Sequence, residues 1–421
     1  MKFVLAFNGS RGDVQPAIAL GTELSTRGHE VVLAVPPNLV DFALSSGLPT
    51  RPYGLDTREL LESEVVSRDL KSANPITRLR AVSEITLRGG RQMQQELLEL
   101  SAGADAIVGG SAGQERAFNV ALARQIPYVP LHFCPIRRNG EVSPLTQFGI
   151  NPPSPLSRAS WAMLEQILWR ASRSAENTLA EDLGLENAHA PAATRIAAAG
   201  HPEIQAYDSA LFPGLAGEWG ARRPLVGFLN LAPDTRRRMG DGFSDDDLLT
   251  WLDAGPPPLY VGFGSMAVAD PDALADIITT ATTTLGLRVL MATGWSGLSV
   301  ADHGDRIYSV PAVDHDTILP RCAGAVHHGG AGSVAATLRA GLPTLVYWLG
   351  ADQPLWGRQV TRLGAGASAP LKKIDVHDLI AALEKVLTHE FAGAAHRIAG
   401  RLVTSDAAVD EAASVVERAV R

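Results

Sequence analysis

Residues 3–14 read FVLAFNGSRGDV and contain the pattern that decides the fold. The apolar run Phe3–Phe7 leads into a glycine-containing turn, and apolar positions then recur at helical spacing from Val14 to Arg27. A second wholly apolar run follows at Val31–Val35. Apolar strands that lack alternation and are separated by a helix are typical of a parallel sheet covered on both faces. The chain therefore opens as a β-α-β unit.

The same alternation continues along the chain and restarts after a proline-rich segment at residues 253–258. In the first half, further strands are predicted at Ala106–Val108 and Tyr128–Leu131. In the second half, the predicted strands are Leu259–Phe263, Arg288–Met291, Ile307–Val310, Ala323–His327 and Thr344–Tyr347. The sequence thus predicts an α/β protein with two Rossmann-like domains that face a central cleft.

Changes in composition set the predicted domain boundaries. We predict an N-terminal domain over residues 1–213, a charged, turn-rich linker over 214–248, and a C-terminal domain over 249–405. A closing helix over 406–421 is expected to pack back across the domains. Within the first domain, residues 136–158 resemble a long loop, and a helix is predicted over Trp161–Leu183.

Composition excludes several classes of protein. Of the 421 residues, 46% are apolar and 19% are charged, which is a globular balance. The net charge of −8 disfavours binding to nucleic acid. Cys134 and Cys322 are the two cysteines, too few for a disulfide framework or a cysteine-based zinc site. No targeting segment or run of 18 apolar residues is visible, so the expected location is the cytoplasm.

The most informative loop spans residues 325–335 and reads AVHHGGAGSVA. It joins a predicted strand to a predicted helix through glycines, which let the backbone approach a ligand closely. The amides at a helix N-terminus attract anions, so a phosphate-bearing ligand is predicted here. We predict that His328 contributes to this anion site and that His327, which points to the other face of the strand, is structural.

Two competing interpretations of neighbouring motifs are less favoured. Gly330–Ala335 fits the G-x-G-x-x-A dinucleotide fingerprint with Asp352 as its acidic partner, but histidines replace the usual apolar strand end. Asp352 also lies several residues beyond its predicted strand. The run Asp314–Asp316 forms a D-x-D that could bind a divalent cation. We favour a helix-capping role for Asp316 over metal binding.

Two further glycine turns follow predicted strands. Gly9–Asp13 precedes a helix, where Asp13 is either a first-turn residue favoured by the helix dipole or a carboxylate able to accept a proton. These two interpretations carry equal weight. At Gly264–Ser265, the hydroxyl of Ser265 could bind phosphate or cap a helix.

Together these stretches resemble the inverting glycosyltransferases of the two-Rossmann-domain (GT-B) architecture, family 1 type. The likeness is greatest to the enzymes of vancomycin-group antibiotics and mycobacterial glycopeptidolipids. It rests on residues 9–14, 34–38, 252–265 and 327–354, of which the last is the most specific. The resemblance covers nearly the whole chain and is weakest at about 55–100 and 136–190.

The resemblance implies a role for each matching residue. Asp13 would be the general base on the acceptor hydroxyl. The donor diphosphate would be bound by Ser10, Ser265, His328, Gly330, Ala331, Gly332 and Ser333. Asp352 and Gln353 would contact the donor sugar, and the backbone at Val313 would meet the nucleotide base.

The function implied is that of a hexosyltransferase. It would move a hexose or deoxyhexose from a uridine or thymidine diphosphate sugar to a hydroxyl of a hydrophobic acceptor, such as a glycolipid, a lipopeptide or another natural product. Neither a metal nor another cofactor is expected. The alternatives are a sugar-nucleotide epimerase of the same fold and a catalytically silent nucleotide-sugar-binding accessory protein.

Peripheral contact with the inner membrane surface is a further expectation if the acceptor is a glycolipid. Residues 58–96 carry Arg78, Arg80, Arg88 and Arg91 among apolar residues. An ordinary solvated helix face explains these arginines equally well.

Overall fold

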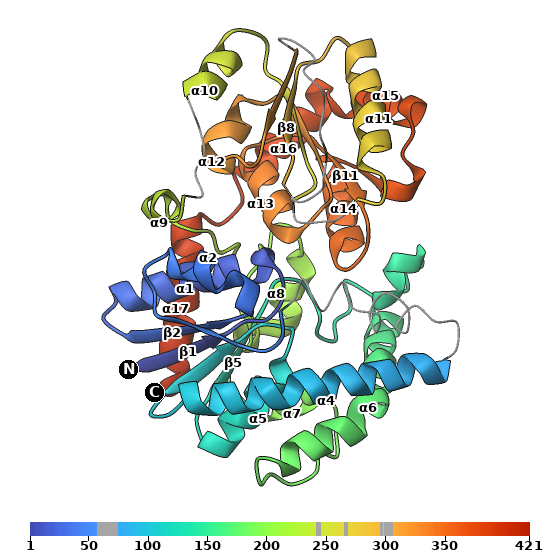
Figure 1. Ribbon diagram of the computed structural model, residues 1–421. Helices are drawn as coiled ribbons and strands as arrows, with labels where there is room; N and C mark the ends of the chain where they lie inside the picture. The colour runs from blue at the N-terminus through green and yellow to red at the C-terminus, as the bar shows by residue number, and fades with distance from the viewer. Residues whose placement is uncertain (57–74, 241–245, 265–267, 295–297, 299–305) are drawn as a thin grey trace. The chain divides into compact units, whose positions relative to one another are not determined.

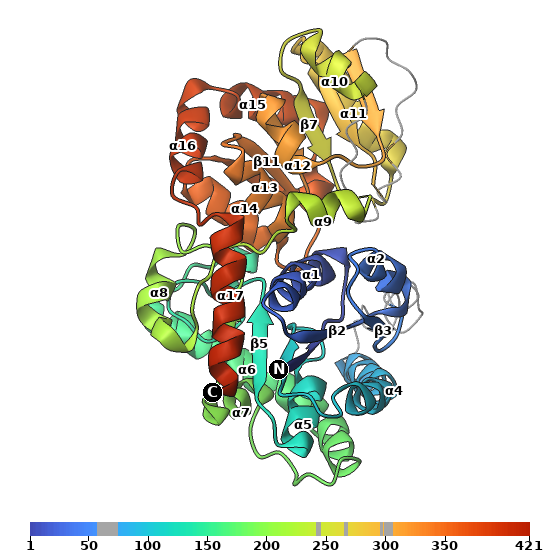
Figure 2. The same cartoon turned by 90° about the vertical axis from the view of Figure 1, so that its left-hand side faces the viewer.

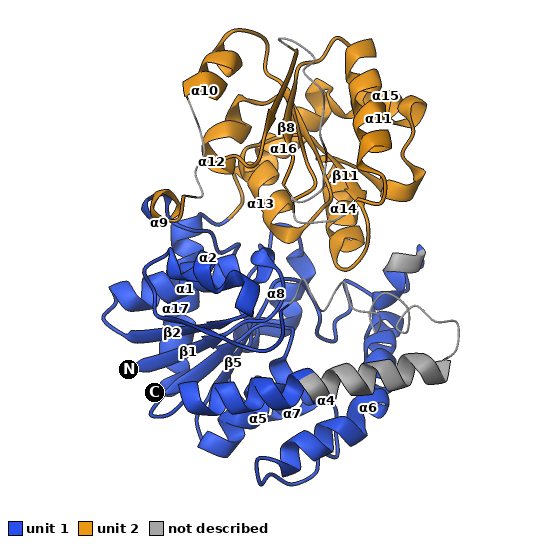
Figure 3. Ribbon diagram, in the orientation of Figure 1, with its two compact units in different colours: residues 1–235, 403–421 blue, residues 236–402 orange. Residues whose placement is uncertain are grey.

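The computed structural model describes residues 1–56, 75–240, 246–264, 268–294, 298 and 306–421 (Figure 1). For residues 75–86, 88, 147 and 148 the description covers the backbone alone. The chain divides into two compact units (Figure 3). Unit 1 comprises Met1–Thr235 together with Val403–Arg421, and unit 2 comprises Arg236–Leu402.

Unit 1 is built on a six-stranded sheet in the order β3-β2-β1-β4-β5-β6, in which all the paired strands run parallel. This is the Rossmann strand order, which reverses direction between β1 and β4. Its strands are β1 (Lys2–Ala6), β2 (Glu30–Val35), β3 (Thr50–Pro52), β4 (Ala106–Gly109), β5 (Tyr128–His132) and β6 (Ile204–Gln205).

Helices cover both faces of this sheet, because successive residues of β1 point to opposite sides. Val4 packs in a core with residues of α4, α5 and α7, whereas Leu5 lies against α1 at Gly21. The helices of unit 1 are α1 (Arg11–Thr26), α2 (Val40–Leu44), α4 (Pro75–Leu100), α5 (Gln114–Arg124), α6 (Ser154–Glu181), α7 (Ala192–Ala199), α8 (Pro213–Trp219) and α17 (Ser405–Val420).

Unit 2 repeats the arrangement with the order β12-β11-β10-β7-β8-β9, again parallel throughout. This is again a Rossmann-type order, in which the chain builds the sheet outward from the two central strands, β7 and β10. The direction of this build-up reverses between β7 and β10. Its strands are β7 (Leu259–Gly262), β8 (Val289–Ala292), β9 (Ile307–Val310), β10 (Gly324–His327), β11 (Thr344–Trp348) and β12 (Gly366–Pro370).

The sheet of unit 2 lies between two layers of helices. Val261 packs in a core with α11 and α15, and its neighbour Tyr260 packs in a second core with α10, α12 and α13. The helices are α10 (Asp246–Asp253), α11 (Pro271–Thr284), α12 (His315–Ile318), α13 (Ala331–Arg339), α14 (Gln353–Arg362), α15 (Val376–Val386) and α16 (His389–Ala399), and α9 (Pro233–Arg238) spans the junction of the units.

The predicted α/β class with two Rossmann-like sheets is confirmed. The sequence interpretation named nine of the strands and left out β3, β6 and β12, which are all edge strands. It also started the long helix at Trp161, whereas α6 begins at Ser154. Proline is tolerated in the first turn of a helix, so the prolines of this segment do not exclude an earlier start.

The units divide at Thr235/Arg236, inside the predicted linker 214–248, and at Leu402/Val403, just before the predicted closing helix 406–421. The segment after residue 213 belongs to unit 1 because its backbone runs beside β6. The amide of Gln205 donates to Pro224 (2.9 Å), and the amide of Val226 donates to Gln205 (3.0 Å). The side chain of Asn230 then bonds to Ser405 (2.9 Å), at the start of α17.

Helix α17 lies alongside α1 within unit 1 (Figures 1 and 2). Arg27, just after α1, joins the two helices by bonds to Asp410, Ser414 and Glu417. The last residues of the chain therefore complete the first domain. Among the described residues, no helix is both long and apolar enough to cross a bilayer.

Candidate active site

The reversal of strand order in unit 2 places the loops after β7 and β10 side by side at the carboxyl edge of the sheet. In open α/β sheets, ligands bind at this position. A Cβ added to Gly264, after β7, would lie 3.1 Å from Cε1 of His328, after β10. The loop after β8 also approaches, because a Cβ on Gly294 would lie 2.4 Å from the carbonyl oxygen of Gly264.

One glycine of the His-His-Gly-Gly loop is required by its backbone and its neighbours. Gly329 has φ of +88°, and a Cβ there would lie 2.4 Å from Cγ1 of Val346. A side chain would therefore be strained and would push the loop away from β11. The absence of a side chain keeps the loop close to the sheet and directs the chain into α13.

Helix α13 begins with backbone amides that no side chain among the described residues caps. Gly330 is the N-cap, and it makes no side-chain hydrogen bond. The amide of Val334 donates within the helix, to the carbonyl of Gly330 (3.0 Å). The preceding amides, of Ala331, Gly332 and Ser333, have no acceptor one turn earlier in the helix. They form the kind of helix end that binds a phosphate.

His328 lies against this helix end as a neutral imidazole. A Cβ on Gly330 would come within 2.6 Å of its Nε2 atom, so this atom lies next to the N-cap. Burial lowers the pKa of His328 to about 4, and the neighbouring His315 contributes to this lowering. A hydrogen bond with the Gly262 backbone acts in the opposite direction. An anion placed beside the ring would favour its protonated form.

His327 has a different role, which the sequence interpretation assigned only as structural. It is completely buried, and its Nδ1 accepts a hydrogen bond from the amide of Gly329 (2.9 Å). Its Nε2 lies 3.5 Å from the hydroxyl of Thr337 on α13. Burial, together with His328 and His315, lowers the pKa of His327 well below its usual value. His327 therefore fixes the loop that His328 presents.

A second polar group lies at the start of α14, after β11. Asp352 is the N-cap of this helix, and its Oδ2 accepts a hydrogen bond from Nε1 of the buried Trp356 (2.7 Å). Burial raises the pKa of Asp352, and the bond from Trp356 acts in the opposite direction. The preceding residue, Ala351, has φ of +55°, a strained conformation that is frequent at functional sites.

Part of the Gln353 side chain binds the backbone of the loop that precedes it. Its Oε1 accepts from the amides of Leu349 (2.8 Å) and Gly350 (3.3 Å), and the residue is 4% exposed. The side-chain NH2 group is the part of Gln353 that remains to donate to a sugar hydroxyl.

The predicted base contact at Val313 lies in the loop after β9. The Val313 side chain is part of the core with Tyr260 and α13, so only its backbone can meet a ligand. The adjacent D-x-D motif is engaged by arginines: Asp314 bonds to Arg236 (2.6 Å), and Asp316 bonds to Arg236 and Arg339.

The prediction that Asp316 caps a helix is wrong by two residues. Asp314, not Asp316, is the N-cap of α12, because its side chain accepts from the amide of Asp316 (3.2 Å). The two flanking arginines lower the pKa of Asp316, although burial acts in the opposite direction. Among the described residues, no group of three or more His, Cys, Asp or Glu side chains could hold a metal ion.

In unit 1, the loop after β1 positions Asp13. Ser10 is the N-cap of α1, and Oδ2 of Asp13 accepts from the Ser10 amide (2.7 Å) and hydroxyl (3.0 Å). Gly9 has φ of +130°, and a Cβ there would lie 2.3 Å from the same oxygen. Asp13 is thus both a first-turn residue and a carboxylate held in one orientation at the reversal of strand order.

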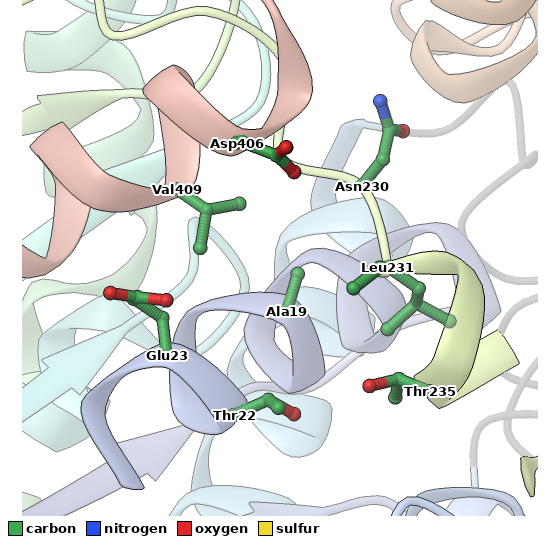
Figure 4. A pocket seen from close by; sticks show the side chains of 9 residues that line it. Ala19, Thr22, Glu23, Asn230, Leu231, Thr235, Asp406 and Val409 are labelled. Carbon is green, nitrogen blue, oxygen red and sulfur yellow. The ribbon is translucent and has the colours of Figure 1, made fainter. Parts of the chain in front are cut away.

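A pocket elsewhere in unit 1 is separate from Asp13 (Figure 4). It has a volume of about 140 Å³ and is lined by Ala19, Thr22, Glu23, Asn230, Leu231, Ala232, Thr235, Asp406 and Val409. Its α1 residues lie six to ten positions after Asp13, which is about 9–15 Å along the helix.

The structure thus groups most of the predicted donor residues on two loops of unit 2, and places Ser10 and Asp13 on one loop of unit 1. Ser265 lies outside the described residues, as do the side chains of Arg78, Arg80 and Arg88. The sequence interpretation missed Gly294 and Trp356. The positive φ of Gly294 had no signal, but a tryptophan one turn after Asp352 was visible.

Two Rossmann-like units, one with an uncapped helix end beside a neutral histidine, define a class of nucleotide-binding α/β proteins with the GT-B architecture. Solved structures of that architecture match across the chain. The glycosyltransferase of kitacinnamycin has a TM-score of 0.73 at 16% identity and covers 100% of this chain and 99% of its own. VinC, solved in complex with dTDP, has a TM-score of 0.68 at 19% identity, with 100% and 99% covered. These likenesses show the fold.

Sequence relatives show the family. Residues 3–112 match the glycosyltransferase family 28 N-terminal domain, and residues 294–420 match the C-terminal domain of the erythromycin biosynthesis protein CIII-like family. An uncharacterized glycosyltransferase of Mycobacterium tuberculosis is 39% identical over 100% of this chain and 99% of its own. The vancomycin aglycone glucosyltransferase of Amycolatopsis orientalis is 30% identical, with 97% and 96% covered. The chain belongs to this family of glycosyltransferases.

Proposed function

We propose that this glycosyltransferase moves a hexose or deoxyhexose from a nucleoside diphosphate sugar to a hydroxyl of a hydrophobic acceptor, with inversion at the anomeric carbon. The observation that carries the proposal is the uncapped start of α13 beside neutral His328, at the point where the strand order reverses. This arrangement suits the diphosphate of the donor. The dTDP bound to VinC, a protein of the same fold, supports a nucleotide ligand.

The names of two relatives support a hydrophobic acceptor. One acts on the vancomycin aglycone. Another is a sterol 3-beta-glucosyltransferase of Arabidopsis thaliana, 30% identical over 96% of this chain and 64% of its own. A glycolipid or lipopeptide falls within the same range of chemistry.

The reaction we propose is a single displacement. The acceptor oxygen forms a bond to the anomeric carbon while the bond from that carbon to the diphosphate oxygen breaks. The acceptor proton passes to the carboxylate of Asp13. The leaving diphosphate takes the electron pair, and the amides of Ala331, Gly332 and Ser333 with His328 stabilise the charge that develops. Asp352 and Gln353 would orient the sugar through its hydroxyls.

We further propose that no metal takes part. The carboxylates of the D-x-D motif bond to Arg236 and Arg339, so they are already neutralised by protein cations. The charge of the leaving group is met by helix amides and a histidine. Addition of EDTA is therefore expected to leave the rate unchanged.

Two alternatives predict different products. An epimerase of the same fold would convert the donor without an acceptor, and a silent accessory protein would bind the donor without converting it. Incubation with a radiolabelled nucleotide sugar, with and without a hydroxylated lipid acceptor, separates them. Transfer of the label to the lipid supports a transferase. Conversion of the donor without lipid supports an epimerase, and binding of the donor without conversion supports an accessory protein.

The decisive variant is Asp13→Asn. Loss of the proposed proton acceptor is expected to reduce transfer by about 10²–10⁴-fold, the usual contribution of a general base. Binding of the nucleotide, measured by calorimetry, should be retained because the proposed donor residues other than Ser10 belong to unit 2. Asp41→Asn, which removes the first-turn carboxylate of α2, controls for the helix-dipole effect. Near-normal turnover in Asp13→Asn would exclude Asp13 as the base.

A further inference from the structure

The five most exposed large apolar side chains of the described residues all lie between positions 150 and 168. They are exposed by 53–59%, and the next in order, Leu44, is 45% exposed. The five are Ile150, Leu156, Met163, Ile167 and Leu168. Isolated apolar residues are normal on a surface, but a cluster of this kind marks an interaction site.

Helix α6 arranges four of these residues as a stripe. Leu156, Met163 and Ile167 are seven and four positions apart, which places them on one face of the helix, and Leu168 borders them. We call Leu156, Met163, Ile167 and Leu168 the α6 stripe. The opposite end of α6 is packed against α4, where Gln94 donates to the carbonyl of Leu179 (2.8 Å) and Arg91 pairs with Asp182 (2.7 Å). The stripe lies in the N-terminal half of α6, and this packed part is at the C-terminal end of the helix.

Positive charge borders the stripe. Arg170 and Arg173 are both exposed and follow Ile167 by three and six positions, so Arg170 continues the same face. Arg173 stacks on Trp169, with its guanidinium carbon 5.1 Å from the ring centroid.

Negative charge is nearly absent from this segment. Residues 150–174 contain one acidic residue, Glu165, in a chain with a net charge of −8. Glu165 is 15% exposed and pairs with Arg138 (3.6 Å). The stripe and its border are thus apolar and basic on a protein that is acidic elsewhere.

We propose that the α6 stripe docks unit 1 on an anionic lipid surface. Interfacial helices bind by burying one apolar face at the level of the headgroups while basic side chains contact anionic lipids. The stripe with Arg170 and Arg173 supplies both interactions. A second protein chain fits less well, since the four side chains of the stripe make a patch of about a few hundred Å², and a stable interface buries about 800 Å² on each partner.

This inference goes beyond the proposed transfer reaction, because docking depends neither on the donor nor on Asp13. It adds a location where an acceptor with a lipid tail is concentrated. It also differs from the sequence expectation for residues 58–96, because α6 carries the contact.

The test is sedimentation of the full-length protein with vesicles. Vesicles of phosphatidylglycerol and phosphatidylcholine (1:1) are compared with phosphatidylcholine alone. We expect binding to the anionic vesicles that is weakened about tenfold or more by 0.5 M NaCl and by Arg170→Gln/Arg173→Gln. Met163→Gln/Ile167→Gln should weaken it by a similar factor, because both side chains would leave the apolar layer.

The matched control is Leu44→Gln/Leu122→Gln, which changes two exposed leucines elsewhere in unit 1 (45% and 42% exposed) and should bind as the wild type does. Calorimetry with dTDP on every variant shows that the donor site is intact and separates this test from the proposed function. Equal sedimentation with both vesicle types, or unchanged binding of the stripe variants, would overturn the proposal. So would a dimer in solution that Met163→Gln/Ile167→Gln dissociates, or a raised KM for a water-soluble acceptor in these variants.

Discussion

At the residue scale, two adjacent histidines at the end of β10 differ because their nitrogens meet different groups. Nδ1 of His327 accepts a backbone amide within its own loop and is shielded from solvent. Nε2 of His328 lies at the start of α13. Strand alternation separates the two side chains, which is why the sequence could distinguish them. It could not supply the contact between His327 and Gly329, which depends on the local path of the loop.

The proposed donor site predicts that binding takes up a proton at His328. The pKa of about 4 keeps the ring neutral in the free protein near pH 6. A bound diphosphate raises this pKa, so at pH values between the free and bound pKa the complex holds more protons than the free protein. Affinity should then fall as the pH rises through the bound-state pKa, by up to tenfold per unit of pKa difference.

Calorimetry with UDP-glucose and dTDP-glucose at pH 5.5, in buffers of different ionisation enthalpy, gives the number of protons taken up. These donors carry no phosphate group that titrates in this range. His328→Gln should abolish the uptake, and His396→Gln, on α16, should leave it unchanged. An equal proton count in His328→Gln and the wild type would refute the role of the ring.

At the element scale, α14 couples a buried tryptophan to the carboxylate at its own start. Nε1 of Trp356 donates to Oδ2 of Asp352 across one turn of helix. If Asp352 contacts the donor sugar, Trp356→Phe frees this carboxylate and raises its pKa further above the usual value, because the bond from Trp356 lowers it. We expect the affinity for the nucleotide sugar to fall about tenfold, the effect of one hydrogen bond to a charged group.

The expected signature is a split between two ligands. Trp356→Phe should weaken binding of dTDP-glucose and leave binding of dTDP unchanged, because dTDP has no sugar at the phosphate end. Trp251→Phe, a matched change in α10, should affect neither. Parallel weakening of both ligands would instead mean that Trp356 supports the loop as a whole.

The same scale shows what the sequence could predict. Strands buried on both sides, such as Val31–Val35, are continuous apolar runs and were found. The missed strands lie at the edges of the two sheets and carry no long apolar run: β3 reads TRP, β6 has two residues, and β12 reads GASAP. Their backbones pair because the adjacent strand is already in place, and their side chains carry no pattern that requires it.

At the scale of the whole molecule, one strand order occurs twice, and each sheet places a glycine loop where its order reverses. The sequence predicted these loops because Gly9–Asp13 and His327–Ser333 interrupt apolar runs. It predicted a linker over residues 214–248, but not the position within this linker at which the units divide. That boundary depends on backbone pairing of residues 224–226 with β6 and on the return of the chain to unit 1 at Val403.

The return of the chain predicts that α17 stabilises unit 1. Arg27 makes five hydrogen bonds, one to Glu23 and the others to Asp410, Ser414 and Glu417. Its side chain is 19% exposed, so these bonds are partly shielded from water. Arg27→Met should lower the free energy of unfolding of unit 1 by about 2–3 kcal/mol, because it leaves the carboxylates of α17 without their cation.

Differential scanning calorimetry with dTDP tests this. Under the proposed function, dTDP binds unit 2 and raises its unfolding temperature. Arg27→Met should lower the unfolding temperature of the other transition, that of unit 1, which dTDP does not shift. The loss should be largest near neutral pH. His29 and Arg27 lower the pKa of Glu417, so the stability that this group contributes is present above its unfolded pKa and disappears as the pH falls through the folded pKa. Hydrogen exchange in residues 405–420 that is as slow in Arg27→Met as in the wild type would show that apolar packing alone holds α17.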